Sequence, residues 1–178
     1  MYLTDRIVSE IIDLPCWATR WRGQFGLELS FGPPKLHIRE PRASNSKRAM
    51  VRRILGHRRV TVRGAWWLWI TTNRWKLTLA DAPTVTPANS DRQIANSVQW
   101  LDGQKLTGFS ISADSAYTQL HFDLGALLEI GQGAVKSDEL WTLSRPSRPP
   151  RALCVRADGL FSHEAASKQN RWRLLSGA

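Results

Sequence analysis

The chain is poor in cysteine and has no long apolar run. Its two cysteines, Cys16 and Cys154, are too few for a disulfide framework or a four-cysteine zinc site, and their apolar neighbours predict buried free thiols. No apolar stretch approaches the roughly 18 residues that a membrane helix needs. The first apolar segment carries Asp5, Glu10 and Asp13, which is unlike a signal peptide. We therefore expect a cytoplasmic protein that does not cross a membrane.

Motifs of catalysis and cofactor binding are also absent. The chain has no phosphate-binding glycine loop, no G-x-G-x-x-G, no G-x-S-x-G, no H-E-x-x-H and no C-x-x-C. The best catalytic candidates are His121 and Asp123, because alternation places both on one face of a strand, where an aspartate could orient the imidazole. Spacing supplies neither a nucleophile nor a third metal ligand. A hydrolase-like enzyme built on this pair is an alternative, and a solvated strand face is the simpler interpretation. We expect no cofactor, no metal and binding without turnover.

Acidic residues are nearly missing from one segment of a chain whose net charge is +10. Between Arg39 and Arg63 there are nine Lys and Arg residues and one acid, Glu40, while the rest of the chain is nearly neutral. Such a segment attracts phosphate or an acidic protein face, or it is a solvated loop that keeps the protein soluble. Met50, Ile54 and Gly56 are spaced like the apolar edge and the end of a short helix. We interpret residues 41–57 as a basic insert.

The remaining sequence is typical of an α+β domain. A first helix is predicted between Thr4 and Pro15, and a second opens with the capping-box pair Ser90 and Gln93 and closes at Gly103. Alternation with a period of two residues predicts a mainly antiparallel sheet of hairpins or a meander around these two helices. The alternating segments are 25–31, 35–40, 58–70, 74–80, 106–113, 116–124, 126–132, 139–144 and 151–157.

One domain is expected over residues 1–166, because 178 residues with 42% apolar content suffice for a single core. Residues 167–178 form a tail without an evident partner. Inside the domain, LSFGPPKLHI (29–38) echoes LHFDLGALLEI (120–130), and each copy follows a predicted helix. The echo suggests two duplicated αββββ halves, 1–88 and 89–166, of which the first carries the basic insert. Chance is the alternative, since Leu-x-Phe strands are common.

Tryptophan is concentrated just after the basic insert. The stretch GAWWLWITTNRWKLTL (64–79) holds four of the nine tryptophans. If Thr72 and Asn73 form a two-residue turn, strands 66–70 and 75–79 pair as a hairpin, and Lys76 lies opposite Trp69. One face of this hairpin is then apolar and belongs to the core, with Trp66, Leu68, Ile70, Trp75, Leu77 and Leu79.

The other face of that hairpin is aromatic and cationic, and it has two interpretations. Either a helix or the tail covers the indoles, or the indoles stack bases while arginines bind phosphates, as in sheet-based binders of single strands. The main expectation is an interaction protein that engages an acidic partner through its basic segment. A single-stranded nucleic-acid-binding protein is the alternative. The candidate binding residues are Arg52, Arg53, Arg58, Arg59, Arg63, Trp67, Trp69 and Lys76.

Overall fold

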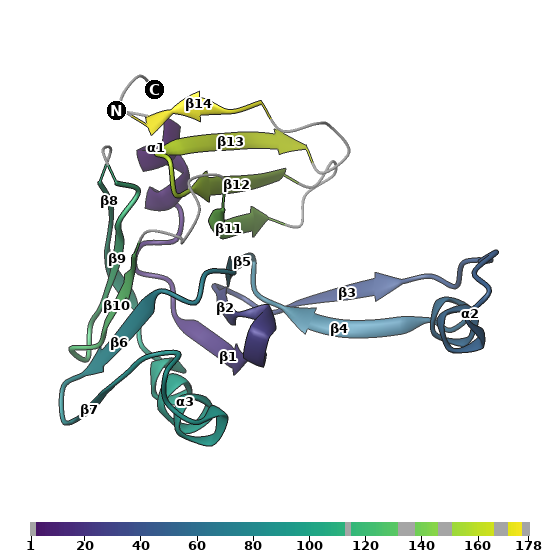
Figure 1. Cartoon of the computed structure of the whole chain (residues 1–178), viewed down its shortest axis with the longest axis horizontal. Helices are drawn as coiled ribbons and strands as arrows, with labels where there is room; N and C mark the ends of the chain where they lie inside the picture. Colours follow the sequence, from purple (N-terminus) through teal and green to yellow (C-terminus); the bar gives the residue numbers. More distant parts are fainter. Residues whose placement is uncertain (1–2, 113–114, 132–137, 146–150, 166–170, 176–178) are drawn as a thin grey trace.

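The computed structural model describes residues 3–112, 115–131, 138–145, 151–165 and 171–175. Two antiparallel sheets enclose the core, and a third, two-stranded sheet projects from them as an arm (Figure 1). The expectation of an α+β fold with mainly antiparallel sheet is confirmed. The described residues form three α-helices: the two expected in the domain and a short one in the basic insert. They are α1 (Leu3–Ser9), α2 (Ala49–Leu55) and α3 (Asp91–Val98), with short 3-10 turns at η1 (Gly23–Phe25) and η2 (Gln99–Leu101).

The larger sheet has the strand order β1-β2-β5-β11-β12-β13-β14, and the smaller has the order β7-β6-β10-β9-β8. The arm pairs β3 (Lys35–Arg39) with β4 (Arg59–Arg63). The strands of the larger sheet are β1 (Cys16–Trp21), β2 (Leu27–Phe31), β5 (Trp66–Ile70), β11 (Glu139–Arg145), β12 (Arg151–Arg156), β13 (Leu160–Ala165) and β14 (Arg173–Leu174). Those of the smaller sheet are β6 (Trp75–Leu79), β7 (Ala82–Val85), β8 (Leu106–Ile111), β9 (Thr118–Phe122) and β10 (Leu127–Ile130).

The predicted hairpin between strands 66–70 and 75–79 is wrong. β5 pairs with β2 and β11, whereas β6 pairs with β10 and β7, so the chain changes sheets between Ile70 and Trp75. The predicted core face is nevertheless right, because alternation decides which side of a strand is buried whatever its neighbour is. Its six members are all buried: Trp66, Leu68, Ile70, Trp75, Leu77 and Leu79.

The two halves of the chain repeat one order of elements. Apart from the strands of the arm, each half has a helix, then three strands in one sheet, then two strands in the other sheet. Three strands of one half therefore adjoin two strands of the other, in the orders β1-β2-β5-β11-β12 and β8-β9-β10-β6-β7. The register repeats as well, because Ile70 lies between Leu27 and Trp141 as Ile130 lies between Thr118 and Trp75. The division at residue 88 stays a prediction, and so does the duplication itself.

The halves cross at Pro15 and Lys105, which form an isolated bridge. Two hydrogen bonds there are equivalent: the Asp13 N–H donates to the Leu106 carbonyl at 2.8 Å, and the Gly103 N–H donates to the Cys16 carbonyl at 2.7 Å. Asp13 and Gly103 both have positive φ, 63° and 94°. The left-handed conformation favours glycine, yet Asp13 adopts it. The crossing therefore requires the same backbone conformation in both halves.

Helix α3 is held in place as its sequence predicts. The Ser90 side chain accepts from the Gln93 N–H and the Gln93 side chain accepts from the Ser90 N–H, so the capping box is confirmed. Ile94 and Val98 are buried, and the Val98 carbonyl accepts from the Thr19 hydroxyl of β1 at 2.8 Å. Helix α1 ends at Ser9, earlier than the predicted end at Pro15, and residues 10–13 form turns. No helix among the described residues has the length and apolarity to traverse a bilayer.

Two further expectations concern the cysteines and the tail. Cys16 and Cys154 are buried free thiols, as expected, and burial raises the pKa of both. The tail, for which the sequence shows no evident partner, is ordered by contact in its described part: β14 pairs with β13, and Leu175 is buried. Residues 167–170 and 176–178 lie outside the described residues. The described part of the tail adds an edge strand to the larger sheet, in which β11, β12 and β13 separate β14 from β5.

Candidate functional site: a cationic and aromatic cleft at the root of the arm

The arm occupies the place of a short turn. In the second half, β9 ends at Phe122 and the next strand of the same sheet begins at Leu127, whereas in the first half the chain runs from Phe31 to Trp66 through β3, α2 and β4. Gly64 permits the sharp return, since a Cβ there would lie 2.5 Å from the Phe31 carbonyl oxygen. The insertion is therefore longer than residues 41–57 and includes both strands of the arm. The expected short helix in the insert is confirmed as α2, which ends at Gly56.

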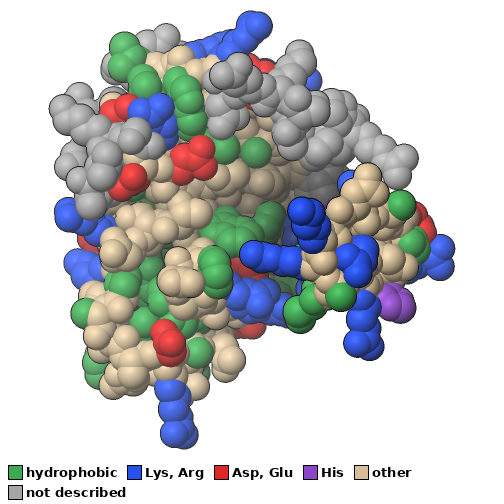
Figure 2. Space-filling view, turned by 45° about the vertical axis from the view of Figure 1, so that its right-hand side comes forward, with side chains coloured by type: hydrophobic (Ala, Val, Ile, Leu, Met, Phe, Trp, Pro, Cys, Tyr) green, Lys and Arg blue, Asp and Glu red, His purple; other side chains and the backbone are tan. Residues whose placement is uncertain are grey.

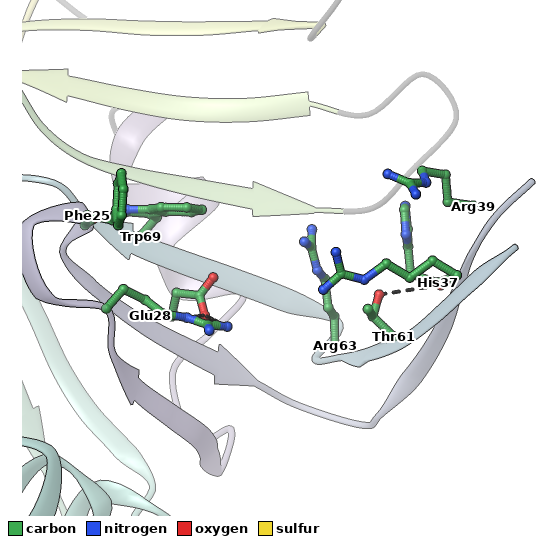
Figure 3. Close-up of a pocket in the computed structure, with 9 residues that line it drawn as sticks. Phe25, Glu28, His37, Arg39, Thr61, Arg63 and Trp69 are labelled. Carbon is green, nitrogen blue, oxygen red and sulfur yellow. Dashed lines mark hydrogen bonds and ion pairs between the residues drawn. The ribbon is translucent and has the colours of Figure 1, made fainter. Parts of the chain in front are cut away.

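Alternation gives the arm one polar face. The cross-strand pairs Lys35 with Arg63, His37 with Thr61, and Arg39 with Arg59 lie on that face. In Figure 3, the side chains of Arg39, His37 and Arg63 point from the arm toward the space above it. This face forms one wall of a cleft of about 410 Å³. The other wall comes from the larger sheet and the turn that enters it, with Arg22, Phe25, Glu28 and Trp69.

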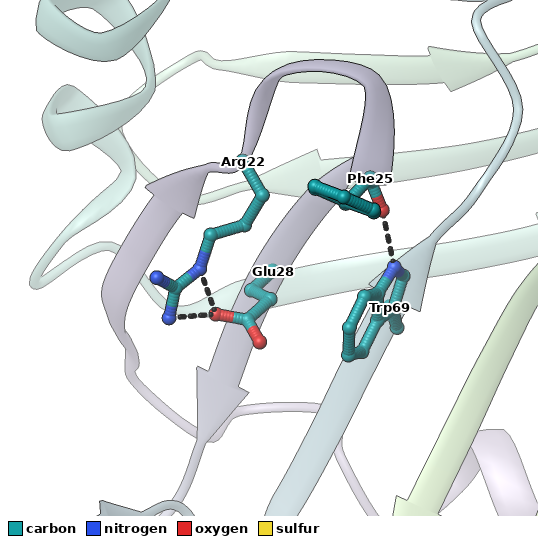
Figure 4. A network of polar contacts seen from close by, with 4 residues as sticks. All are labelled: Arg22, Phe25, Glu28 and Trp69. Atoms are coloured by element: carbon teal, nitrogen blue, oxygen red, sulfur yellow. Dashed lines mark hydrogen bonds and ion pairs between the residues drawn. The ribbon is translucent and has the colours of Figure 1, made fainter. Parts of the chain in front are cut away.

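The aromatic end of the cleft is built by Trp69 and Phe25. The Trp69 indole N–H donates to the backbone carbonyl of Phe25 at 2.7 Å, which fixes the indole beside the turn that carries Phe25 (Figure 4). Trp67 meets Trp69 edge to face with ring centroids 5.0 Å apart, and the Arg63 guanidinium lies 4.1 Å from the centre of the Trp67 ring. Phe25 is 65% exposed. The cleft therefore presents one exposed ring beside an indole whose orientation is fixed.

Positive charge exceeds negative charge in this cleft. Arg22 is neutralised by Glu28, with 2.9 Å between Nη2 and Oε2. No ion pair among the described residues involves Arg39, Arg59 or Arg63. Arg39 donates from Nη2 to the Ile54 carbonyl at 2.6 Å, but its buried Nε has no hydrogen-bond partner in the described part of the chain. Arg39, Arg59 and Arg63 therefore leave the cleft with an excess of positive charge.

The structure brings four of the eight predicted binding residues together. Arg59, Arg63 and Trp69 line the cleft, and Trp67 contacts Arg63 and Trp69 behind it. Lys and Arg side chains gather between the arm and the body and around the end of the arm (Figure 2). The predicted strand 58–70 is wrong as a single strand, because it breaks at Gly64 and Ala65. Arg59 and Arg63 lie on β4 of the arm, whereas Trp67 and Trp69 lie on β5 of the larger sheet.

The other four predicted residues lie elsewhere. Arg52 donates from its Nη1 to the backbone carbonyls of Ser46 and Lys47. Arg53 is exposed on α2, and Arg58 forms an ion pair with Glu40 at 2.8 Å. The position predicted for Lys76, opposite Trp69, is wrong. Lys76 belongs to the smaller sheet, where its Nζ lies 2.5 Å from Glu129.

Sequence reasoning missed six residues that line the cleft: Arg22, Phe25, Glu28, His37, Arg39 and Thr61. A signal for two of them was present, because the alternation of residues 35–40 puts His37 and Arg39 on one face. No local pattern indicates that Phe25 lies beside Trp69, since 44 positions separate them.

His121 and Asp123 do not form a catalytic arrangement in the described residues. The Asp123 carboxylate accepts from the Lys105 N–H at 2.8 Å, so it caps backbone at the start of β8. His121 is exposed, and neither residue lines the cleft at the arm. No cluster of three or more potential metal ligands occurs within the described ranges.

No family model, no curated protein and no solved structure matches this chain.

Proposed function

We propose that this protein binds single-stranded nucleic acid, without turnover, in the cleft between the arm and the larger sheet. One observation carries the proposal: Arg39, Arg59 and Arg63 share a cleft with the rings of Phe25 and Trp69. Binders of single strands combine cations that contact phosphates with aromatic rings on which bases stack. An acidic protein face would use the arginines and leave the rings idle, so the rings favour nucleic acid as the ligand of this cleft.

Three details support this ligand. Arg63 is held over Trp67, so its charge is already fixed beside the rings. The Trp69 N–H is used by Phe25, so Trp69 offers its ring and not a donor, which suits stacking that is independent of sequence. Arg39 lines the cleft and forms no ion pair among the described residues, so its guanidinium adds positive charge for a phosphate. The cleft therefore provides charge, stacking and a fixed geometry together.

The test is the affinity of the full chain for fluorescently labelled oligo-dT and oligo-U at several salt concentrations. We expect log affinity to fall against log salt with a slope of about 0.7 for each phosphate contact. Phe25→Ala is expected to weaken binding by roughly 1–3 kcal/mol, because it removes a stacking ring. Its exposure keeps the cost to folding small.

Trp100→Ala is the matched control, because Trp100 is 70% exposed on η2 and does not line the cleft. Arg59→Gln is compared with Arg92→Gln on α3 in the same way, and only Arg59→Gln should lower the salt slope. Equal effects of Phe25→Ala and Trp100→Ala would show that no base stacks at the cleft and would overturn the proposal.

A further inference from the structure

The face of the arm that points away from the cleft is apolar and exposed. Two cross-strand pairs form it, Leu36 with Val62 and Ile38 with Val60. These four side chains are 52–69% exposed. We call them the aliphatic face of the arm. They are the residues that alternate with the polar face, so they lie on the opposite side of the same two strands.

An exposed aliphatic face on a two-stranded sheet is unusual. A lone hairpin is only marginally stable in water, and it normally packs its apolar side against another layer. Other large exposed apolar residues of the body, such as Trp100 and Leu124, occur singly. A contiguous patch rimmed by charge is typical of an interaction surface. No described segment of this chain covers the aliphatic face.

The charge of the arm indicates which kind of partner would cover the aliphatic face. Ten of the chain's 25 Lys and Arg residues and one of its 15 acids lie between Lys35 and Arg63. A second copy would bring an equally basic arm against the first, and like charges oppose that approach. A partner with carboxylates around an apolar centre is complementary. Exposed cations of the arm that take part in no ion pair among the described residues are available to it: Arg42, Lys47, Arg48 and Arg53.

We propose that the aliphatic face of the arm docks an acidic amphipathic helix of another protein. Residues two apart on a strand are separated by roughly 6.6 Å, and residues four apart on a helix by roughly 6 Å along the axis. The two rows, Leu36 with Val62 and Ile38 with Val60, therefore match successive apolar turns of a helix. Glutamates on its flanks would reach the arginines of the arm. This inference is independent of the proposed nucleic-acid site, which lies on the opposite face.

The probe is a synthetic peptide of about five helical turns, with leucine on one face and glutamate elsewhere. Two matched peptides replace either the leucines by serine or the glutamates by lysine. Fluorescence anisotropy with the full chain should show binding of the first peptide and binding at least about tenfold weaker for both others. Equal binding of the serine peptide would reduce the contact to charge alone and overturn the proposal.

The matched variant is Ile38→Thr combined with Val60→Thr, which keeps β-branched side chains in the strands while removing the apolar surface. We expect about tenfold weaker binding of the leucine–glutamate peptide. Leu124→Ser, which removes an exposed apolar side chain of the body, should have no effect. If circular dichroism shows that the double variant perturbs the arm, Leu36→Thr alone tests the same face. Unchanged peptide affinity in a folded variant of this face would contradict the proposal.

Two further outcomes separate this proposal from its rivals. If sedimentation shows a dimer that Ile38→Thr with Val60→Thr converts to monomer, a second copy covers the face and the proposal is wrong. Phe25→Ala should leave peptide affinity unchanged, because Phe25 lines the cleft at the polar face of the arm and is remote from the aliphatic face. If peptide binding follows this pattern while oligonucleotides do not bind, the docking surface stands and the proposed function fails.

Discussion

The two halves of this protein use equivalent positions on their outer sheet faces in opposite ways. Trp69 lies between Glu28 and Thr142 in the larger sheet, and Glu129 occupies the corresponding place between Gln119 and Lys76 in the smaller one. Trp69 turns its ring toward an open cationic cleft. Glu129 accepts a hydrogen bond from Tyr117 and pairs with Lys76, so its charge is neutralised within its own sheet.

The difference teaches where the candidate function resides. The scaffold repeats in order and register, and what departs from the repeat is the arm together with the rings beside it. A cleft beside Glu129, of about 340 Å³, is lined by Arg74, Lys76 and Glu129, so its net charge is +1. The cleft at the arm has four arginines and one glutamate, so its net charge is +3. Binding of a polyanion is therefore expected at the side of the molecule that breaks the repeat, and each prediction below removes or transfers one part of that asymmetry.

The largest effect is expected from removing the arm. Replacing residues 32–65 by the connection that the second half uses, Asp123–Leu124–Gly125, joins Phe31 to Trp66 as Phe122 is joined to Ala126. We expect the body to fold, since no buried core residue lies in 32–65 and only Ala65 of that range packs against the core. Oligonucleotide affinity should fall at least about a hundredfold, because the phosphate-binding cations are lost. Thermal unfolding checks the first result and anisotropy the second. Retained affinity in the folded variant would place the nucleic-acid site elsewhere.

The next effect is expected from transferring the pattern of the smaller sheet to the larger one. Trp69→Glu combined with Thr142→Lys recreates the pair formed by Glu129 and Lys76. We expect oligonucleotide affinity to fall by roughly 1–3 kcal/mol from the lost stacking alone, and further because a carboxylate enters the cleft. Thr142→Lys alone is the control, and the added cation should not weaken binding. An unchanged affinity in the double variant would mean that Trp69 is not a stacking surface.

The smallest effect is expected in the smaller sheet. Burial by itself raises the pKa of Glu129, but the hydrogen bonds from Lys76 and Tyr117 outweigh it, so the pKa lies below its usual value. Glu129 then stabilises the folded state above the pKa of the unfolded chain, and this contribution disappears as the pH falls through the lower folded pKa. Glu129→Gln should lower stability by about 0.2–1 kcal/mol at neutral pH and remove that acid dependence.

Urea unfolding of the parent and Glu129→Gln chains from pH 7 to pH 3 measures this difference. Glu40→Gln is the control, since the pair of Glu40 with Arg58 is exposed on both sides. Neither Glu129→Gln nor Lys76→Gln should alter oligonucleotide affinity, because both residues lie outside the cleft at the arm. Weaker binding in Lys76→Gln would restore the role that the sequence had suggested for this lysine.

Local patterns in the sequence determined the elements and their buried faces. The capping box of Ser90 and Gln93, the end of α2 at Gly56 and the alternation of Trp66, Leu68 and Ile70 each depend on neighbours within a few positions. The same is true of the placement of Arg59 and Arg63 on one side of their strand. Such features are set by the geometry of a single helix or strand, so they can be derived without knowing what lies beside it.

The tertiary structure alone decided which strands are neighbours. The alternation of residues 66–79 is satisfied equally by a hairpin and by two strands in separate sheets, because period two specifies faces and not partners. The crossing between sheets moved Lys76 away from Trp69. Long-range packing also brought Phe25 beside the indole and Arg39 into the same cleft, from distant points of the chain. Strand order depends on long-range packing of both halves around one core, and that information is not contained in any local stretch of the sequence.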